Sequence, residues 1–151
     1  MNDVMETFEG KVAVITGGAA GIGLALARML ASEGARLVLG DIEQSALDAA
    51  VADLGANGAD VIGHRCDVSQ LAEVEVLADV AEERFGAIHI AVNNAGVAAG
   101  GAAWDVDHAT WEWVLGVDLW GVIHGVRTFV PRIIAAGGGH VVNTASMAGL
   151  T

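Results

Sequence analysis

The chain has 151 residues, of which 54% are hydrophobic and 17% charged, a composition that fits one folded domain and excludes a disordered polymer. Its 21 glycines follow no three-residue period, so a collagen helix is excluded as well. The formal net charge of −12 repels nucleic-acid backbones and anionic membrane surfaces, and we expect neither as a partner.

Cys66 is the only cysteine, so no internal disulfide can form, and the chain suits a reducing compartment such as the cytoplasm. The first ten residues are acidic and lack the apolar core of a signal peptide. No apolar run reaches the length of about 18 residues that a membrane-spanning helix needs. Histidine and cysteine are not spaced as metal ligands, so we expect no metal site.

Short apolar runs alternate with longer stretches of helical periodicity, which predicts strands separated by helices. In chain order, the sequence predicts a strand at 11–16, a helix at 21–32, a strand at 36–40, a helix at 43–54, a strand at 60–66, a helix at 71–85, a strand at 87–93, a long helix from Asp107 or Thr110 to about Ile134, and a strand at 140–144.

Two local features refine this prediction. Ser69 precedes the third helix and is a candidate for its N-cap. Gly116, Gly121 and Gly125 interrupt the long helix, which makes it the helix that we expect to bend. The alternation as a whole predicts βαβ units, a parallel sheet and helices on both of its faces. No repeat or linker is visible, so the prediction is one domain over 1–151.

The first strand runs into a glycine-rich turn, Thr-Gly-Gly-Ala-Ala-Gly-Ile-Gly, over 16–23. Gly17, Gly21 and Gly23 permit a tight turn, close approach of a pyrophosphate and packing of helix on strand. An ordinary βα turn is the alternative, but the flanking strand and helix favour dinucleotide binding. Leu24 stands where a P-loop requires lysine, so a P-loop is excluded.

Asp41 ends the second strand, where a carboxylate can bind the adenosine ribose hydroxyls and repel a 2′-phosphate. Ile42 follows it, and no lysine or arginine lies in the turn to bind such a phosphate. The sequence therefore favours NAD over NADP. The alternative is that Asp41 only caps the next turn or helix.

These motifs, together with three later ones, resemble the short-chain dehydrogenase/reductase family. The later motifs are Asp67-Val68 after the third strand, the Asn-Asn-Ala-Gly signature over 93–96, and Ser146 at the end of the fifth strand. The resemblance covers 11–150. It implies a Rossmann-type, doubly wound parallel sheet with strand order 3-2-1-4-5, an NAD(P)-binding domain that is incomplete at its C-terminus and lacks the family's later strands.

The resemblance also implies site residues. The cofactor-binding set is Gly17, Gly21, Ile22, Gly23, Asp41, Ile42, Asp67, Val68, Asn94, Ala95 and Gly96. Ser146 would bond the substrate oxygen, and Asp118 stands in place of the family's asparagine in the long helix. Read without the resemblance, Asp67 could be a helix-start residue, the paired asparagines turn formers, and Ser146 any loop serine.

The implied reaction is hydride transfer between a nicotinamide and a secondary alcohol or ketone, in a homo-oligomer. The family uses a Tyr-x-x-x-Lys motif, but these 151 residues contain no tyrosine, and Lys11 is their only lysine. We therefore expect this chain alone to bind NAD without turning it over. The alternative is a non-catalytic NAD-binding or interaction protein.

Two expectations concern exposed groups. The four tryptophans cluster around the long helix, and we expect them to pack in the core or against another subunit. The alternative is that Trp104 borders an apolar substrate. The strand at 140–144 should form an open sheet edge, which favours self-association.

Overall fold

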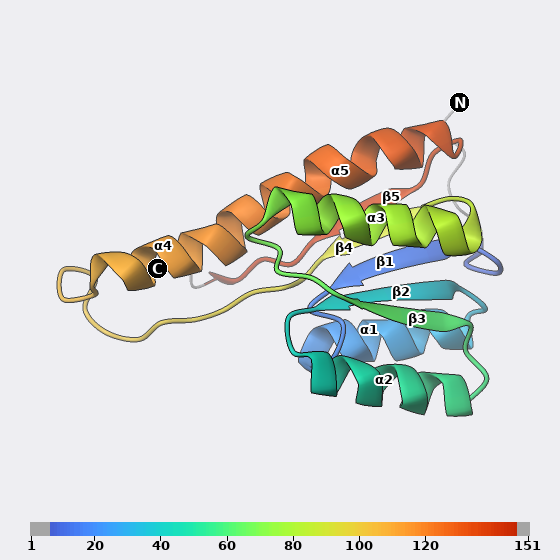
Figure 1. Ribbon diagram of the computed structural model, residues 1–151, viewed down its shortest axis with the longest axis horizontal. Helices are drawn as coiled ribbons and strands as arrows, with labels where there is room; N and C mark the ends of the chain where they lie inside the picture. The colour runs from blue at the N-terminus through green and yellow to red at the C-terminus, as the bar shows by residue number, and fades with distance from the viewer. Residues whose placement is uncertain (1–6, 148–151) are drawn as a thin grey trace.

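The computed structural model describes residues 7–147 and forms one parallel sheet of five strands, in the order β3-β2-β1-β4-β5 (Figure 1). This is the predicted order. The elements are β1 Val12–Thr16, α1 Gly21–Ser32, β2 Arg36–Asp41, α2 Gln44–Ala56, β3 Val61–Arg65, α3 Leu71–Phe85, β4 Ile90–Asn93, α4 His108–Leu115, the π-helical segment η1 Gly116–Trp120, α5 Gly121–Ala135 and β5 His140–Asn143.

Helices cover both faces of the sheet, α1 and α2 on one side and α3 and α5 on the other (Figure 1). Side chains of β1 alternate between these faces. Val12 and Val14 belong to the core cluster with α3 and α5, whereas Ala13 and Ile15 belong to the cluster with α1 and α2. The central strand is therefore buried on both faces, as parallel sheets require.

A predicted strand start and a predicted helix cap differ from the structure. The strand predicted at 87–93 begins only at Ile90, and just before it Nδ1 of His89 accepts a hydrogen bond from the amide of Val12. The predicted N-cap at Ser69 is absent, since α3 begins at Leu71. There, Glu73 reaches back and accepts a 2.7 Å hydrogen bond from the amide of Asp67.

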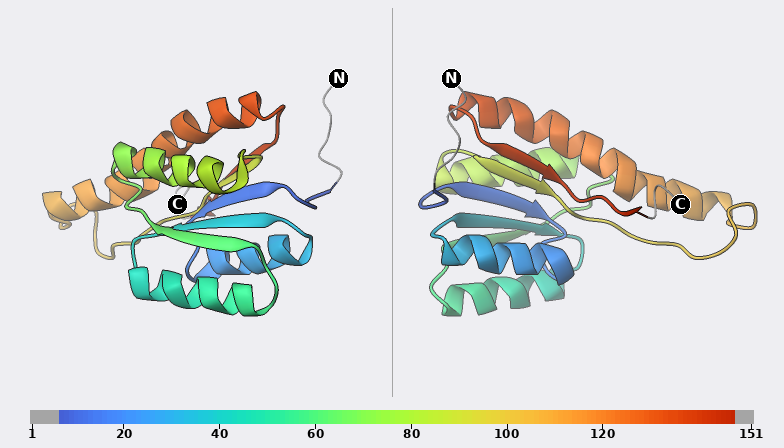
Figure 2. Two further views of the ribbon diagram at one scale, coloured as in Figure 1. Left: turned by 45° about the vertical axis from the view of Figure 1, so that its right-hand side comes forward. Right: turned by 180° about the vertical axis from the view of Figure 1, so that it is seen from behind.

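The long helix is continuous but not uniformly α-helical. Asp107 is its N-cap and accepts a 2.7 Å hydrogen bond from the amide of Thr110, which lowers the pKa of the Asp107 carboxyl. Gly116 opens the π-helical segment and Gly121 follows it, at two of the three glycines expected to disturb the helix. The part of the long helix that precedes this segment, α4, projects past the end of the sheet (Figure 2).

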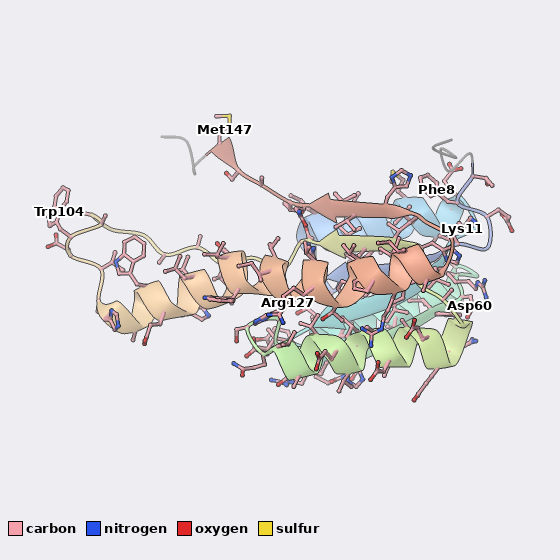
Figure 3. All side chains as sticks on the ribbon, turned by 90° about the horizontal axis from the view of Figure 1, so that it is seen from above. Phe8, Lys11, Asp60, Trp104, Arg127 and Met147 are labelled. Atoms are coloured by element: carbon pink, nitrogen blue, oxygen red, sulfur yellow. The ribbon has the colours of Figure 1, made fainter. Side chains whose placement is uncertain are left out.

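The tryptophans were expected to pack in the core or against another subunit; they do not pack in the core of this chain, and packing against another subunit stays a prediction. Trp104 is 86% exposed, and the three on the helix are about half exposed. Figure 3 places Trp104 at the outer tip of the loop before α4, away from the sheet. The β5 edge is open as expected, since all four residues of that strand are exposed.

Within residues 7–147, no helix has both the length and the apolar character needed to cross a membrane. The same residues contain no group of three His, Cys, Asp or Glu side chains able to hold a metal ion.

Candidate cofactor-binding site

A cleft of about 640 Å³ lies at the carboxyl ends of the strands. Its lining comes from the segments that follow each of the five strands and from the start of the long helix. The lining residues are Gly17, Ala20, Gly21, Ile22, Asp41, Ile42, Glu43, Cys66, Asp67, Val68, Asn94, Ala95, Gly96, Val97, Trp113, Val117 and Thr144. Such a volume suits an extended small molecule.

The glycine-rich turn has the conformation that its glycines permit. Gly17 and Gly21 have φ values of +62° and +51°, which side chains rarely adopt. A Cβ on Gly23 would lie 2.1 Å from the Gly17 carbonyl oxygen, so only glycine lets α1 pack on the turn. A Cβ on Gly21 would meet no atom within 4 Å, which leaves open space on the cleft side.

The start of α1 offers backbone donors to this space. Its N-cap residue, Ala20, has no side chain able to bond the first amides of the helix. Unbonded amides at a helix start, with the helix dipole behind them, form a site for an anion without lysine or arginine. A phosphate or diphosphate is an anion of the kind that such a helix start can bind.

Asp41 lies at one end of the cleft and is held by the backbone. Its Oδ2 accepts a 3.0 Å hydrogen bond from the amide of Ala19, and its Oδ1 accepts a 3.1 Å bond from the amide of Glu43. The turn-capping role that was the alternative interpretation is therefore real. An ionised carboxylate has about four acceptor sites, so these two bonds leave capacity for ribose hydroxyls.

The segment after β3 forms the adjoining wall. Oδ1 of Asp67 accepts a 2.9 Å bond from the amide of Ser69, and Val68 is 7% exposed. Beside them, burial and, to a smaller extent, the carboxylates of Glu73 and Asp67 together raise the pKa of the Cys66 thiol to about 12. Cys66 is therefore an apolar wall at neutral pH, not a nucleophile.

Thr16 joins the glycine-rich turn to the Asn-Asn-Ala-Gly segment. Its Oγ1 accepts hydrogen bonds from the amides of Asn94 (3.0 Å) and Ala95 (3.2 Å) and donates to the Val92 carbonyl (3.3 Å). The side-chain amide of Asn94 returns two bonds, to the carbonyls of Thr16 (3.1 Å) and Gly17 (3.2 Å). These bonds fix the floor of the cleft.

The end of β5 closes the other side. Oγ1 of Thr144 donates a 3.2 Å hydrogen bond to Oδ1 of Asn94, so this amide side chain is bonded at both of its ends. One residue earlier on each strand, Nδ2 of Asn93 donates a 2.8 Å bond to Oδ1 of Asn143. Ser146 lies two residues beyond Thr144 and is not part of the lining.

Asp118 sits on the π-helical segment and contacts the opposite rim. Its Oδ1 accepts a 2.9 Å hydrogen bond from the amide of Val97 and is the nearest atom to a Cβ built on Gly96, at 3.5 Å. Asp118 itself does not line the cleft.

Ten of the thirteen predicted site residues line the cleft, and the exceptions are Gly23, Asp118 and Ser146. Sequence reasoning missed the apolar lining from the long helix, Trp113 and Val117. A helical spacing of four places these two on one face, but nothing in the sequence indicates that the face turns toward the cleft. Thr144 was missed because a threonine ending a strand carries no distinctive signal.

The strand order, the glycine-rich turn and the position of the cleft define a Rossmann-type α/β domain. Residues 11–151 match the family model described as short chain dehydrogenase. The chain belongs to the short-chain dehydrogenase/reductase family.

Relatives and solved structures agree with this assignment. The chain is 44% identical to 1-deoxy-11-beta-hydroxypentalenate dehydrogenase of Streptomyces avermitilis, covering 89% of this chain and 51% of that protein. It is 39% identical to D-threitol dehydrogenase of Mycolicibacterium smegmatis, covering 93% and 54%. A crystal structure of a short-chain dehydrogenase/reductase from Burkholderia phymatum in complex with NAD superposes with a TM-score of 0.95 at 51% identity, covering 97% of this chain and 53% of that one. The chain spans about half the length of the curated relatives it matches.

Proposed function

We propose that the protein is an NAD-dependent oxidoreductase that interconverts a secondary alcohol and a ketone. Its relatives are dehydrogenases, and a similar structure at 51% identity contains NAD. The observation that carries the proposal is the cleft, which runs from Asp41 past an uncapped helix start to the ends of β4 and β5.

The order of groups along the cleft suggests how the cofactor lies. Asp41 would bind the adenosine ribose, the amides at the start of α1 the diphosphate, and the Asn94–Gly96 segment the nicotinamide half. In this arrangement, Asp41 and Glu43, which both line the cleft, would put negative charge beside the additional phosphate of NADP. This charge supports NAD in preference to NADP.

When bound, the nicotinamide would supply or accept the hydride, and the chain's own residues would position the reactants. The Thr16–Asn94–Thr144 bonds hold the cleft floor rigid, so that the bound ring meets a fixed surface. By family resemblance, Ser146 would donate a hydrogen bond to the substrate oxygen. Asp118 would hold the rim at Val97 and, as a carboxylate, can accept protons but not donate them when ionised.

General acid–base catalysis in the family depends on a tyrosine whose pKa of about 10 is lowered by a nearby lysine. The 151 residues contain no tyrosine, and Lys11 lies before β1. We therefore propose that these residues alone bind NAD without oxidising an alcohol. We also propose that they self-associate, because the β5 edge and several large apolar side chains are exposed.

Titration calorimetry of the purified 151-residue chain with NAD and NADP tests the cofactor proposal. We expect binding of NAD in the micromolar range and at least tenfold weaker binding of NADP. Equal affinities would contradict the role given to Asp41, and absence of binding would contradict the cofactor site itself. Reduction of NAD to NADH by this chain, with oxidation of a secondary alcohol from a panel to its ketone, would contradict its predicted inactivity. A monomer in sedimentation would contradict self-association.

A further inference from the structure

Trp113 is the one aromatic side chain among the cleft-lining residues, and neither the sequence motifs nor the proposed mechanism gives it a role. It lies on α4, the part of the long helix that projects past the sheet (Figure 2). Its side chain is 51% exposed, although tryptophan is among the residues with the most apolar surface to bury. An indole left half exposed in a cleft is available to a ligand.

The neighbouring tryptophan has a different environment. Successive helical residues are rotated by about 100°, so residues two apart lie on nearly opposite faces. Trp111 accordingly lines a separate hollow of about 230 Å³, formed with the loop before α4, whereas Trp113 faces the main cleft. The orientation of Trp113 toward the cleft is therefore specific to its helix face.

That face is held against the segment after β3. Val117, one turn after Trp113, lines the cleft and packs on the core cluster that contains Val68. A Cβ on Gly116 would lie 3.5 Å from Cβ of Ser69, and a Cβ on Gly121 would lie 2.7 Å from Cγ2 of Val68. His124 adds a 2.9 Å hydrogen bond between its Nδ1 and the Val68 carbonyl. The helix is thus fixed beside the 67–69 segment on one side of the cleft.

The proposed function places the adenosine on this same side of the cleft, next to Asp41. Ile42 and Val68 add apolar surface at the ends of β2 and β3, and Trp113 faces the same cleft from the helix. A purine is planar and apolar on both faces, and an indole is the side chain that stacks best on such a surface. The other cleft-lining residues from the helix and strand ends offer no comparable flat surface.

We infer that Trp113 covers the adenine ring of the bound dinucleotide and contributes a substantial part of its affinity. The inference rests on the proposed function, since it assigns one residue to the adenosine half of that same site. It predicts that the contribution of Trp113 is independent of the nicotinamide.

ADP-ribose, which has the adenosine and diphosphate but no nicotinamide, makes the decisive comparison with NAD. In Trp113→Ala we expect the Kd to rise about tenfold for both ligands, by the same factor, which is within the range of base–aromatic stacking. Trp113→Phe should keep most of the affinity. The matched control is Trp104→Ala, because Trp104 is exposed and does not line the cleft.

Fluorescence gives a second readout that a merely structural role would not change. ADP-ribose should quench the tryptophan emission of the wild-type chain and of Trp104→Phe, but not that of Trp113→Phe. Since α4 contains no buried residue and Trp104 is exposed, these variants remove no core contact, and circular dichroism should confirm that they fold.

Each remaining outcome has a definite meaning. Unchanged affinities in Trp113→Ala would overturn the inference, and so would a loss for NAD alone, which would place the indole at the nicotinamide half. A wild-type chain that binds neither ligand would refute the proposed function and the inference with it. If the wild-type chain binds both ligands but Trp113 affects neither the Kd nor the fluorescence change, only the inference is refuted.

Discussion

The amide of Val97 donates a 2.9 Å hydrogen bond to Oδ1 of Asp118, and this bond joins the segment after β4 to the π-helical turn of the long helix. The two residues are 21 positions apart in the chain. The bond holds the rim of the cleft beside the Asn-Asn-Ala-Gly segment. An asparagine, which the family resemblance implies at this position, also carries a side-chain oxygen able to accept such a bond.

Two substitutions of Asp118 distinguish the contribution of its acceptor oxygen from that of its negative charge. Asp118→Asn keeps an acceptor for the Val97 amide and should change the free energy of unfolding by less than about 0.5 kcal/mol. Asp118→Ala removes the acceptor and should cost about 1 kcal/mol, with a several-fold weaker affinity for NAD. Urea denaturation and calorimetry measure the two effects. Equal behaviour of the two variants would show that the hydrogen bond does not hold the rim.

Gly125 is the closest point between α5 and β4. A Cβ at Gly125 would lie 1.9 Å from Oδ1 of Asn93, a buried atom with no hydrogen-bond partner among the described residues. Gly125→Ala should therefore destabilise the fold by about 1–3 kcal/mol, as overpacking of a rigid core does.

A second helical glycine provides the control for this prediction. A Cβ at Gly55, near the end of α2, would meet no atom within 4 Å. Gly55→Ala should be neutral or stabilising by up to about 1 kcal/mol, because alanine is the better helix former. Urea denaturation compares both variants with the wild type. A Gly125→Ala chain as stable as Gly55→Ala would show that α5 is not packed on Asn93.

Removal of the Asp41 carboxylate should change cofactor preference. Asp41→Ala eliminates the ribose acceptor and the negative charge near the 2′ position, so NAD should bind about tenfold more weakly while NADP loses less or gains. The Kd of NADP divided by the Kd of NAD, both measured by calorimetry, should therefore fall.

The same substitution removes two backbone contacts, at Ala19 and Glu43. Asp41→Asn removes the charge but retains one side-chain oxygen, so it keeps one of the two backbone contacts and is the intermediate variant between the wild type and Asp41→Ala. A ratio that stays at the wild-type value in both variants would mean that Asp41 only caps the turn.

His89 makes stability depend on pH in a predictable direction. Burial, and then the charges of Lys11 and Arg36, lower the pKa of His89 from its usual 6.5, and its Nδ1 must be unprotonated to accept from Val12. Below about pH 6.5, His89 is protonated in the unfolded chain. In the folded chain it stays neutral until the pH approaches its own lower pKa. The stabilisation is therefore complete above pH 6.5 and decreases as the pH falls toward the folded-state pKa.

His89→Asn isolates this contribution, because asparagine offers an oxygen near the Nδ1 position and does not titrate. Between pH 7.5 and 5.5, the wild type should lose more of its free energy of unfolding than His89→Asn, as measured by urea denaturation. Parallel curves for the two chains would show that His89 does not contribute to the pH dependence.

Much of this architecture was predictable because the signals were local. Alternating apolar runs and amphipathic stretches predicted every helix and strand in its order, and the glycines of the 16–23 turn have the positive φ angles and close contacts that their spacing implied. Asp107 and Thr110 were the two helix starts that the sequence predicted, and Asp107 is the N-cap. Each of these features depends on residues a few positions apart.

Features that depend on distant contacts were predicted less well. Just before β4, the ring of His89 accepts a hydrogen bond from the Val12 amide, 77 residues away in the chain. The exposure of the tryptophans depends on the direction in which α4 projects from the sheet. The hydrophobic periodicity of the sequence does not indicate this direction. The Thr144–Asn94 bond joins residues 50 positions apart, and neither residue type signals it.

The π-helical turn has a consequence for the phase of the long helix. A π turn contains about one residue more than an α turn, so it rotates everything before it by about 100° relative to everything after it. The helix can therefore aim Phe129 and Ile133 into the core beneath the sheet while turning Trp113 toward the cleft. A chain shortened by one residue in Gly116–Trp120 should keep its helix, but its Trp113 indole would be turned by about 100° from the direction of the cleft.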